Sequence, residues 1–568
     1  MLLTTYQPDI ESIGGSLTAS ALVAAVPLAT LFVMLGALRI TAWISGLTAL
    51  GAALLVAIAG FGMPVDQALL AGSQGAAFGF FPIMWIVINA IWVYNMTVQT
   101  GHFDVLRRSF GRVSDDMRIQ AIIIAFCFGA LLEALAGFGT PVAITSVMLI
   151  ALGFQPIKAA TVALVANTAP VAFGALAVPI TTLSTVTGFP VDTLGGLVGH
   201  QTPVLALFVP LALVFIVDGR RALRQVWLPA LVCGFAFAAA QWLTATYFSV
   251  PLTDIVAALV GALAVVVLLR FWQPAEPYQE VEVETMAVSG GSGQTAVVGG
   301  GSTGGGTGTK TGARPESPIT DPGGEVAKAY APYLVIIAVF SLVQIPALKS
   351  ALADAPFFTS FQWPGLHLLT AGGDPSSLPT FNLNWLGAAG TLMIISGLIT
   401  MPIIGISPLT AARTYVKTYV QLAAAIVTVM AVLGLAYVMN SSGQTTSLGT
   451  WMAQTGSAFA LLSPVLGWLG VAVTGSDTSS NSLFGALQVT AAGKTGLDPA
   501  LMAAANSSGG VLGKMISPQN LAIAAAAVGM TGREGDIFRK VVGWSVLFLA
   551  VMCVLVYLQT TVLSWMLP

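Results

Sequence analysis

Charged side chains are scarce in this sequence. Only 8% of the 568 residues are Asp, Glu, Lys or Arg, whereas soluble domains carry about 25%. Hydrophobic residues make up 56%, and the formal net charge is −2. The composition therefore excludes a soluble globular protein and predicts a polytopic protein embedded in a lipid bilayer. No basic run suggests a nucleic-acid partner.

Histidine and cysteine are also rare, with three of each. The cysteines lie in apolar segments without metal-ligand spacing, so we interpret them as small buried side chains. The histidines are scattered, which argues against a metal site. Within the apolar segments neither Gly-x-Ser-x-Gly nor His-Glu-x-x-His occurs, and nothing resembles a nucleotide-binding loop. A membrane-embedded hydrolase, the alternative from another class, therefore lacks its machinery; no enzyme and no cofactor are expected.

Long apolar runs predict an all-α fold with about 12–14 transmembrane helices. The first run, Leu17–Leu38, is long enough to cross a bilayer. Arginines cluster in the loop over residues 107–118 and again over Arg220–Arg224. Because positively charged loops stay in the cytoplasm, these clusters place the N-terminus on the extracytoplasmic side.

The composition changes abruptly between residues 273 and 327. This stretch is acidic at first and then rich in Gly, Ser and Thr. Such a segment cannot bury a core, so it is predicted to be a flexible cytoplasmic linker. It divides the chain into an N-terminal membrane half, residues 1–272, and a C-terminal membrane half, residues 328–568.

One apolar stretch of the first half contains a carboxylate and then breaks. Glu133 is followed by Gly137, Gly139, Thr140 and Pro141, deep in hydrophobic sequence. An ionisable residue near the middle of a bilayer is costly and indicates a functional site. Gly and Pro interrupt a helix, and irregular backbone at that depth requires burial in protein or contact with a water-filled cavity. The pattern therefore favours a binding site.

The second half repeats this arrangement. Thr474–Asn481 is a run of small polar residues that includes Asp477. Asn506 follows Thr478 at nearly the separation at which Asn167 follows Thr140. We interpret residues 119–176 and 474–520 as two related units, each a broken hairpin followed by a helix that breaks at its asparagine. Interrupted segments at corresponding places in two halves indicate the substrate site of a transporter.

These stretches resemble the bacterial lactate permease family. The resemblance is carried by Phe126–Ile144, Asn167–Gly174, Gly467–Gly470, Thr474–Asn481 and Gly509–Gln519, and it departs from the family at Ala134-Leu135, where Gly-Ala is more usual. It implies a symporter of the plasma membrane that takes up lactate, and often glycolate, with a proton. It also implies kinship with the ion transporter superfamily, whose members have inverted repeats and re-entrant hairpins. Na⁺ coupling, D-lactate transport and a homodimer are left open.

A 2-hydroxy carboxylate needs hydrogen-bond donors and positive potential, which helix N-termini and short polar side chains supply. The candidate substrate-binding residues are Gly137, Gly139, Thr140, Asn167, Thr168, Ser476, Thr478, Ser479, Ser480, Asn481, Asn506 and Lys514. The alternative is that the small polar residues cap helices or join them.

Proton coupling needs a carboxyl group that can exchange a proton inside the protein. Glu133 and Asp477 are the candidates, one in each unit. Glu133 is favoured as the proton site, and Asp477 is alternatively a helix cap. Lys514 is expected to pair with the substrate, or with one of these carboxylates when the site is empty; a lysine reaching to the membrane surface is the alternative.

Overall fold

The computed structural model describes residues 5–38, 40–111, 113–137, 139–278, 321–343, 345–370 and 373–567. Among these residues, eleven helical segments are long and apolar enough to cross a membrane. A twelfth results if the bent pair Pro156–Ala166 and Val171–Thr187 is one span. The predicted polytopic helical fold is confirmed. The hairpin arms account for the wide range predicted, because a segment such as Thr140–Ala151 is too short to span by itself.

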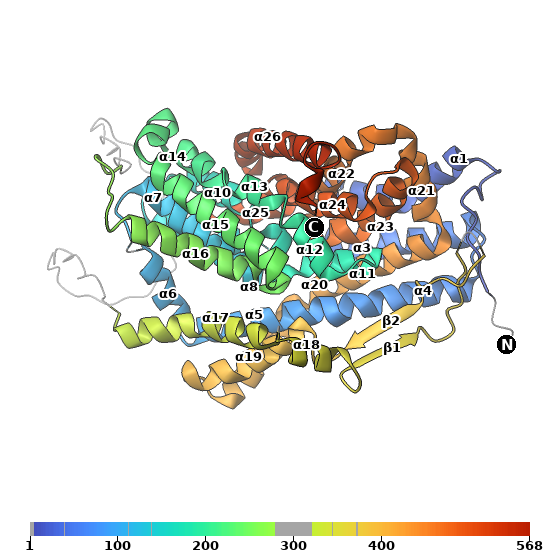
Figure 1. Ribbon diagram of the computed structural model, residues 1–568, viewed down its shortest axis with the longest axis horizontal. Coiled ribbons are helices and arrows are strands. Elements are labelled where there is room, and N and C mark those ends of the chain that lie inside the picture. The colour runs from blue at the N-terminus through green and yellow to red at the C-terminus, as the bar shows by residue number, and fades with distance from the viewer. Residues whose placement is uncertain are drawn as a thin grey trace, which may run out of the picture.

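The helices pack mainly within two groups. In Figure 1 most of the first group lies below the second, but its helices over residues 17–24 and 444–452 lie at the upper right. The first group comprises α1 (Leu17–Ala24), α2 (Val26–Phe32), α3 (Ala42–Leu55), α4 (Val65–Phe78), α5 (Trp85–Gln99), α6 (His102–Gly111), α17 (Gly323–Val343), α18 (Pro346–Ala353), α19 (Ala389–Ile403), α20 (Pro408–Ser442) and α21 (Gln444–Met452). It also carries an antiparallel hairpin of β1 (Phe358–Gln362) and β2 (Thr380–Asn384), in which Phe361 pairs with Phe381.

The second group holds the two broken units. It comprises α7 (Met117–Gln120), α8 (Gly129–Ala136), α9 (Thr140–Ala151), α10 (Pro156–Ala166), α11 (Gly174–Thr187), α12 (Val191–Val198), α13 (Thr202–Ala206), α14 (Val209–Gln225), α15 (Trp227–Tyr247), α16 (Thr253–Leu268), α22 (Phe459–Thr474), α23 (Asp477–Thr495), α24 (Pro499–Gly513), α25 (Pro518–Ala527) and α26 (Glu534–Gln559). Each group draws on both halves of the chain. The predicted division of the chain at the linker into two membrane halves that each contain one broken unit stays a prediction.

Helix α20 links the groups and shows how the sequence sets the length of an element. Ser407 caps its N-terminus by accepting a hydrogen bond from the Thr410 N–H, and Pro408 follows at the first helical position, where its missing donor costs nothing. The helix then runs for 35 residues, until Gly443 adopts the left-handed conformation at φ +88°. It packs on α3 and α4 of the first group and on α23 of the second.

The two broken units correspond in their packing. In the first, α8 and α9 form the hairpin and α10 and α11 the broken helix; in the second these places are taken by α22, α23, α24 and α25. The second hairpin arm of each unit packs on the last helix of the other, α9 on α25 and α23 on α11. This reciprocal contact is what a two-fold relation between the units predicts, and it brings both breaks to the same region.

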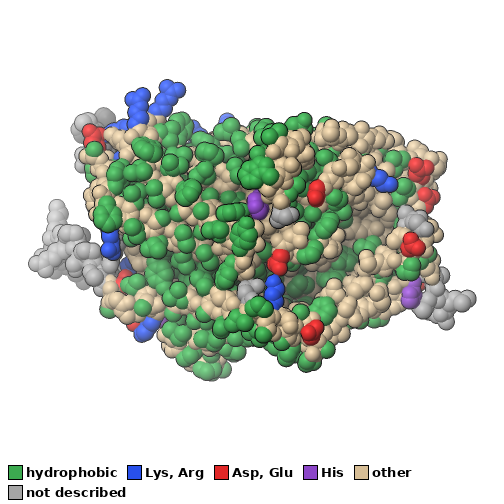
Figure 2. Space-filling view, viewed as in Figure 1, with side chains coloured by type: hydrophobic (Ala, Val, Ile, Leu, Met, Phe, Trp, Pro, Cys, Tyr) green, Lys and Arg blue, Asp and Glu red, His purple; other side chains and the backbone are tan. Residues whose placement is uncertain are grey.

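The outer surface is apolar. Large hydrophobic side chains are widely exposed, including Leu22 (64%), Phe235 (65%) and Val420 (75%). Figure 2 shows hydrophobic side chains over most of the left and lower parts of the visible face, with a small number of charged ones near its middle. A soluble monomer does not expose apolar surface on this scale, so this face is suited to lipid.

The predicted linker falls largely on residues 279–320, which lie outside the described residues. The chain before this gap contacts the second group, and the chain after it contacts the first. Buried Arg118 donates to Asp218 and to the Glu276 carbonyl oxygen, at 3.0 and 2.8 Å. A hydrogen bond from Arg221 holds the pKa of Glu276 below its usual range. Beyond the gap, Asp321 pairs with Arg108 at 2.7 Å. The flanks of the linker region therefore contact arginines of α6, α7 and α14.

Candidate functional site

The tip of the second hairpin is a turn between α22 and α23. Gly475 ends α22 in the left-handed conformation, at φ +75°, where a side chain would be strained. Ser476 then caps α23, because its hydroxyl oxygen accepts the Ser479 N–H at 3.3 Å. The first turn of α23 thus presents the N-terminal end of a helix, which favours an anion.

The first unit supplies a hairpin tip and a broken helix. Gly137 and Gly139 separate α8 from α9, and Gly139 has φ +85°. Helix α10 ends at Ala166 with Asn167 as its C-cap, and the helical segment that resumes at Val171 is bent from it by 63°. Three consecutive non-glycine residues, Ala175 to Ala177, have φ of 45–60° at the start of α11. Each such residue costs about 1–2 kcal/mol, so surrounding packing holds this strained turn in place.

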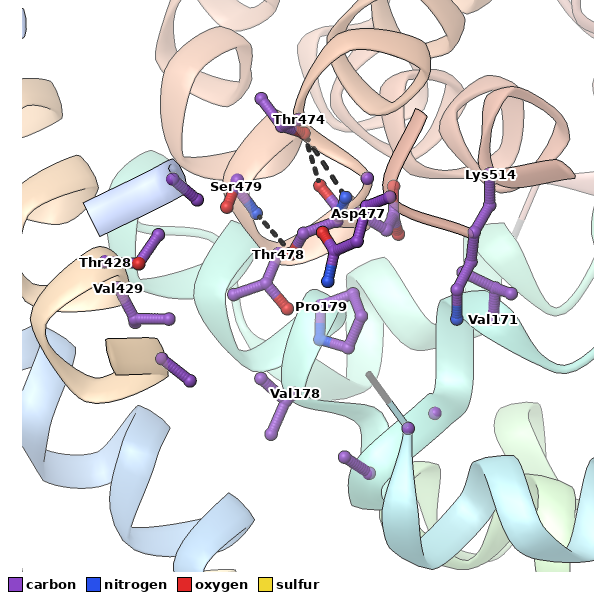
Figure 3. A pocket seen from close by; sticks show the side chains of 18 of the residues that line it. Val171, Val178, Pro179, Thr428, Val429, Thr474, Asp477, Thr478, Ser479 and Lys514 are labelled. Carbon is purple, nitrogen blue, oxygen red and sulfur yellow. Dashed lines mark hydrogen bonds between the residues drawn. The ribbon is translucent and has the colours of Figure 1, made fainter. Parts of the chain in front are cut away.

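These breaks meet in a cavity of about 370 Å³. Figure 3 shows the start of α23, with Asp477, Thr478 and Ser479, next to Pro179 of α11, while Lys514 descends from the end of α24 with its nitrogen towards Val171. The first group closes the opposite side with residues at the start of α3 and, from α20, Thr428 and its neighbours. The cavity therefore lies between the two helix groups.

A buried ion pair joins the two units. The Lys514 ammonium donates to Glu133 Oε1 at 2.6 Å, and the two side chains are 7% and 4% exposed. The Asn167 amide donates to Glu133 Oε2 at 2.9 Å. Gly174 lies so close that a Cβ there would be 2.9 Å from Glu133 Oε1. Glu133 is thus held by three segments, and Lys514 keeps two N–H donors without a partner among the described residues.

Asp477 has a different environment. Its Oδ2 accepts hydrogen bonds from the Ser507 hydroxyl at 2.5 Å and from the Asn481 amide at 3.4 Å. Its Oδ1 has no hydrogen-bond partner among the described residues, and no cation pairs with it there. Because burying an unpaired charge is costly, this setting suits a carboxyl group that carries a proton.

The structure brings seven of the fourteen predicted site residues to the wall of the cavity. They are Glu133, Gly137, Ser476, Asp477, Thr478, Ser479 and Lys514. The others lie behind the wall. Three asparagines donate to neighbouring side chains: Asn167 to Glu133, Asn481 to Ser507 and Asn506 to Asn481. Ser480 donates to the Gly467 carbonyl and Thr168 to the Val165 carbonyl. Gly139 and Thr140 lie at the start of α9, near α25.

The prediction that the second broken helix breaks at Asn506 is wrong. Helix α24 is continuous from Pro499 to Gly513, and the interruption comes at residues 514–517, before Pro518. The small residues after Asn506 serve close packing instead, since Gly509 lies against the Pro464 backbone of α22. Proline restricts the residue before it and so sets the break.

Two alternatives for charged residues are also excluded. Ser476, not Asp477, caps α23. Lys514 does not extend to the membrane surface, because it is 6% exposed and paired with Glu133.

Several wall residues carried no signal in the sequence. Thr41, Ala424 and Thr428 come from the first group; Thr41 precedes α3, and the other two lie in α20, an ordinary apolar helix. Gln519 follows Pro518 and lies against Gly475. A search for polar side chains near helix breaks would have found Gln519, but the α3 and α20 contributions depend on how the groups pack.

Broken helices whose ends and charged side chains meet in a cavity inside a multi-pass helical protein define a membrane transporter. The family model for L-lactate permease matches residues 20–563. An L-lactate permease of Bacillus subtilis is 41% identical, over 98% of this chain and 98% of that protein. The glycolate permease GlcA of Escherichia coli is 40% identical, over 97% and 98%. The chain belongs to the L-lactate permease family, and the resemblance seen in the sequence is confirmed.

Among solved structures, the YdaH transporter of Alcanivorax borkumensis is similar at 17% identity, with a TM-score of 0.43 over 87% of this chain and 88% of that one.

Proposed function

We propose that this protein imports L-lactate, and also D-lactate and glycolate, across the bacterial plasma membrane. The observation that carries the proposal is the position of Lys514 opposite the N-terminal end of α23 in one cavity. The ammonium and the free backbone N–H groups of α23 would bind the substrate carboxylate. The hydroxyl groups of Thr478 and Ser479 would bind the 2-hydroxyl group. The names of the relatives support this class of substrate.

The charges in the cavity favour proton symport through Glu133. In the empty site the Lys514–Glu133 pair is neutral. A lactate anion that pairs with Lys514 would leave Glu133 as an uncompensated buried charge, unless a proton enters with it. One lactate and one proton would thus convert one neutral arrangement into another, with Glu133 as the proton acceptor.

Asp477 would contribute to coupling as a protonated carboxyl. It lies beside the proposed carboxylate site, and an ionised Asp477 would repel the substrate. A proton on Asp477 turns this group into a donor. Both carboxyl groups are therefore proposed as proton-coupling residues. Protonation of Glu133 frees Lys514 to pair with the substrate, and protonation of Asp477 removes a negative charge that would repel it.

The arrangement of the groups supports a transport motion and an orientation. The cavity lies between the groups, so displacement of the group with the broken units would carry the site past the α3 and α20 wall. Lys and Arg side chains gather at the left end of Figure 2, the end of α6 and α14 in Figure 1, whereas α1 lies at the right end. By the positive-inside rule, the N-terminus is extracytoplasmic and the linker cytoplasmic.

Uptake of labelled L-lactate by purified protein in liposomes tests this function. We expect an inward proton gradient to drive accumulation without Na⁺, and Glu133→Gln to abolish accumulation while lactate exchange persists. Glu276→Gln is the control, because this side chain is 64% exposed and does not line the cavity. Accumulation driven only by Na⁺ would refute proton coupling. No lactate transport under either gradient would refute the function and reopen the hydrolase alternative.

A further inference from the structure

A third buried carboxyl group, Asp254, lies outside the cavity in the first turn of α16. It is 0% exposed. Its Oδ1 accepts a hydrogen bond from Gln241 Nε2 at 3.0 Å. Its Oδ2 has no hydrogen-bond partner among the described residues. A single neutral donor is little compensation for an ionised carboxylate removed from water.

The surroundings of Asp254 offer no positive charge. Helix α16 packs on α8, α11 and α15, on the π-helical stretch Ala121–Phe128 and on the turn Val250–Leu252. The titratable groups on these elements are Glu133, Cys127, Cys233 and Tyr247. Of these, Glu133 is close enough to interact electrostatically with Asp254. An ionised Asp254 would therefore have Glu133 as an acidic neighbour and no cation on the elements packed against α16, since Lys514, which pairs with Glu133, lies on none of them.

Gln241 connects Asp254 to the broken helix of the first unit. Its Nε2 atom also donates to the Ala169 carbonyl oxygen, at 3.1 Å. Ala169 lies in the break between α10 and α11, two residues after Asn167, which donates to Glu133. The break is thus linked to Glu133 through Asn167 and to Asp254 through Gln241. A change in charge on Asp254 alters how the Gln241 amide is shared between its two acceptors.

We propose that Asp254 is a further proton-binding site of this protein, outside the substrate cavity, and that Gln241 ties its protonation to the position of the break. The inference rests on the proposed function in one respect, because the break carries part of the proposed lactate site. With a proton on Asp254, Glu133 has no anionic neighbour on the α16 side. Its charge is then set by Lys514 and the substrate.

Infrared spectroscopy of the full-length protein in lipid at neutral pH tests the proton directly. We expect a carbonyl band of a protonated carboxyl that Asp254→Asn removes. Asp192→Asn is the matched control, because its side chain is 74% exposed and its removal should affect only the ionised carboxylate bands. If Asp254→Asn removes ionised carboxylate absorption instead, the proposal is overturned.

Gln241→Met keeps the test decisive if Asp254→Asn does not fold. This variant retains the carboxyl group but removes its donor, so the Asp254 carbonyl band should move to higher frequency. An unshifted band would overturn the link through Gln241. Lactate counterflow measured in the same vesicles separates the two claims: absent counterflow in the unmodified protein refutes the proposed function, while the infrared bands still decide the proton on Asp254.

Discussion

The Glu133–Lys514 pair makes the sharpest energetic prediction. Its atoms are 2.6 Å apart and both side chains are almost fully buried. Removing one partner of a buried pair leaves an uncompensated charge and costs about 3–5 kcal/mol, whereas replacing both is close to neutral. Lys514→Met and Glu133→Gln should therefore each destabilise the protein strongly, and the double variant should recover most of the loss. The Asn167 hydrogen bond to Glu133 softens the effect of Lys514→Met, because it still supports the carboxylate.

A double-mutant cycle on the free energy of unfolding in lipid or detergent measures this coupling. We expect an interaction energy of about 2 kcal/mol or more, beyond the additive behaviour of distant sites. The control cycle uses Arg533 and Asp536, a surface pair at 2.8 Å whose side chains are 65% and 30% exposed, which should show little coupling. Additive effects of Glu133→Gln and Lys514→Met would refute the buried pair, and with it the charge balance proposed for symport.

Three further predictions concern the hairpin tip, the first unit and the two helix groups. Gly475→Ala should reduce lactate transport at least tenfold, because φ is +75° and the new Cβ would lie 2.6 Å from the Gln519 side chain. The control Gly493→Ala, with open space around it, should transport normally. Equal activities of the two variants would contradict the strained tip. Asn167→Leu should weaken lactate affinity measured by counterflow, since it removes a donor from the buried carboxylate of the first unit; unchanged affinity would count against that contact. Asp192 on α12 and Lys349 on α18 are paired at 3.3 Å across the groups, so a cysteine at each position, cross-linked, should stop transport until the link is reduced; transport through the cross-linked protein would rule out relative movement there.

The sequence predicts the units well because their signals are local. Gly137, Gly139 and Gly475 mark the hairpin tips, and two of them adopt the left-handed conformation for which glycine is suited. Glu133 stands out because a carboxylate in an apolar helix is costly. Such features need no knowledge of distant residues.

Long-range partners are harder to predict. Lys514 could pair with Glu133, Asp477 or substrate by sequence alone, and the choice depends on how two segments 381 residues apart pack. The sequence does not single out Asp254, because it stands at the start of an apolar run like a residue at the membrane edge, yet it is completely buried. The sequence predicts a break at Asn506 where the helix is continuous, because a local pattern of small polar residues and glycines does not distinguish helix interruption from close helix packing.

Electron cryomicroscopy of the protein with saturating L-lactate tests the central claim most directly. The account predicts lactate density in the cavity between the helix groups, with the carboxylate within hydrogen-bond distance of Lys514 Nζ and of the first backbone N–H groups of α23. Lactate density elsewhere, with the Lys514–Glu133 pair intact and the cavity filled only by water, would contradict it.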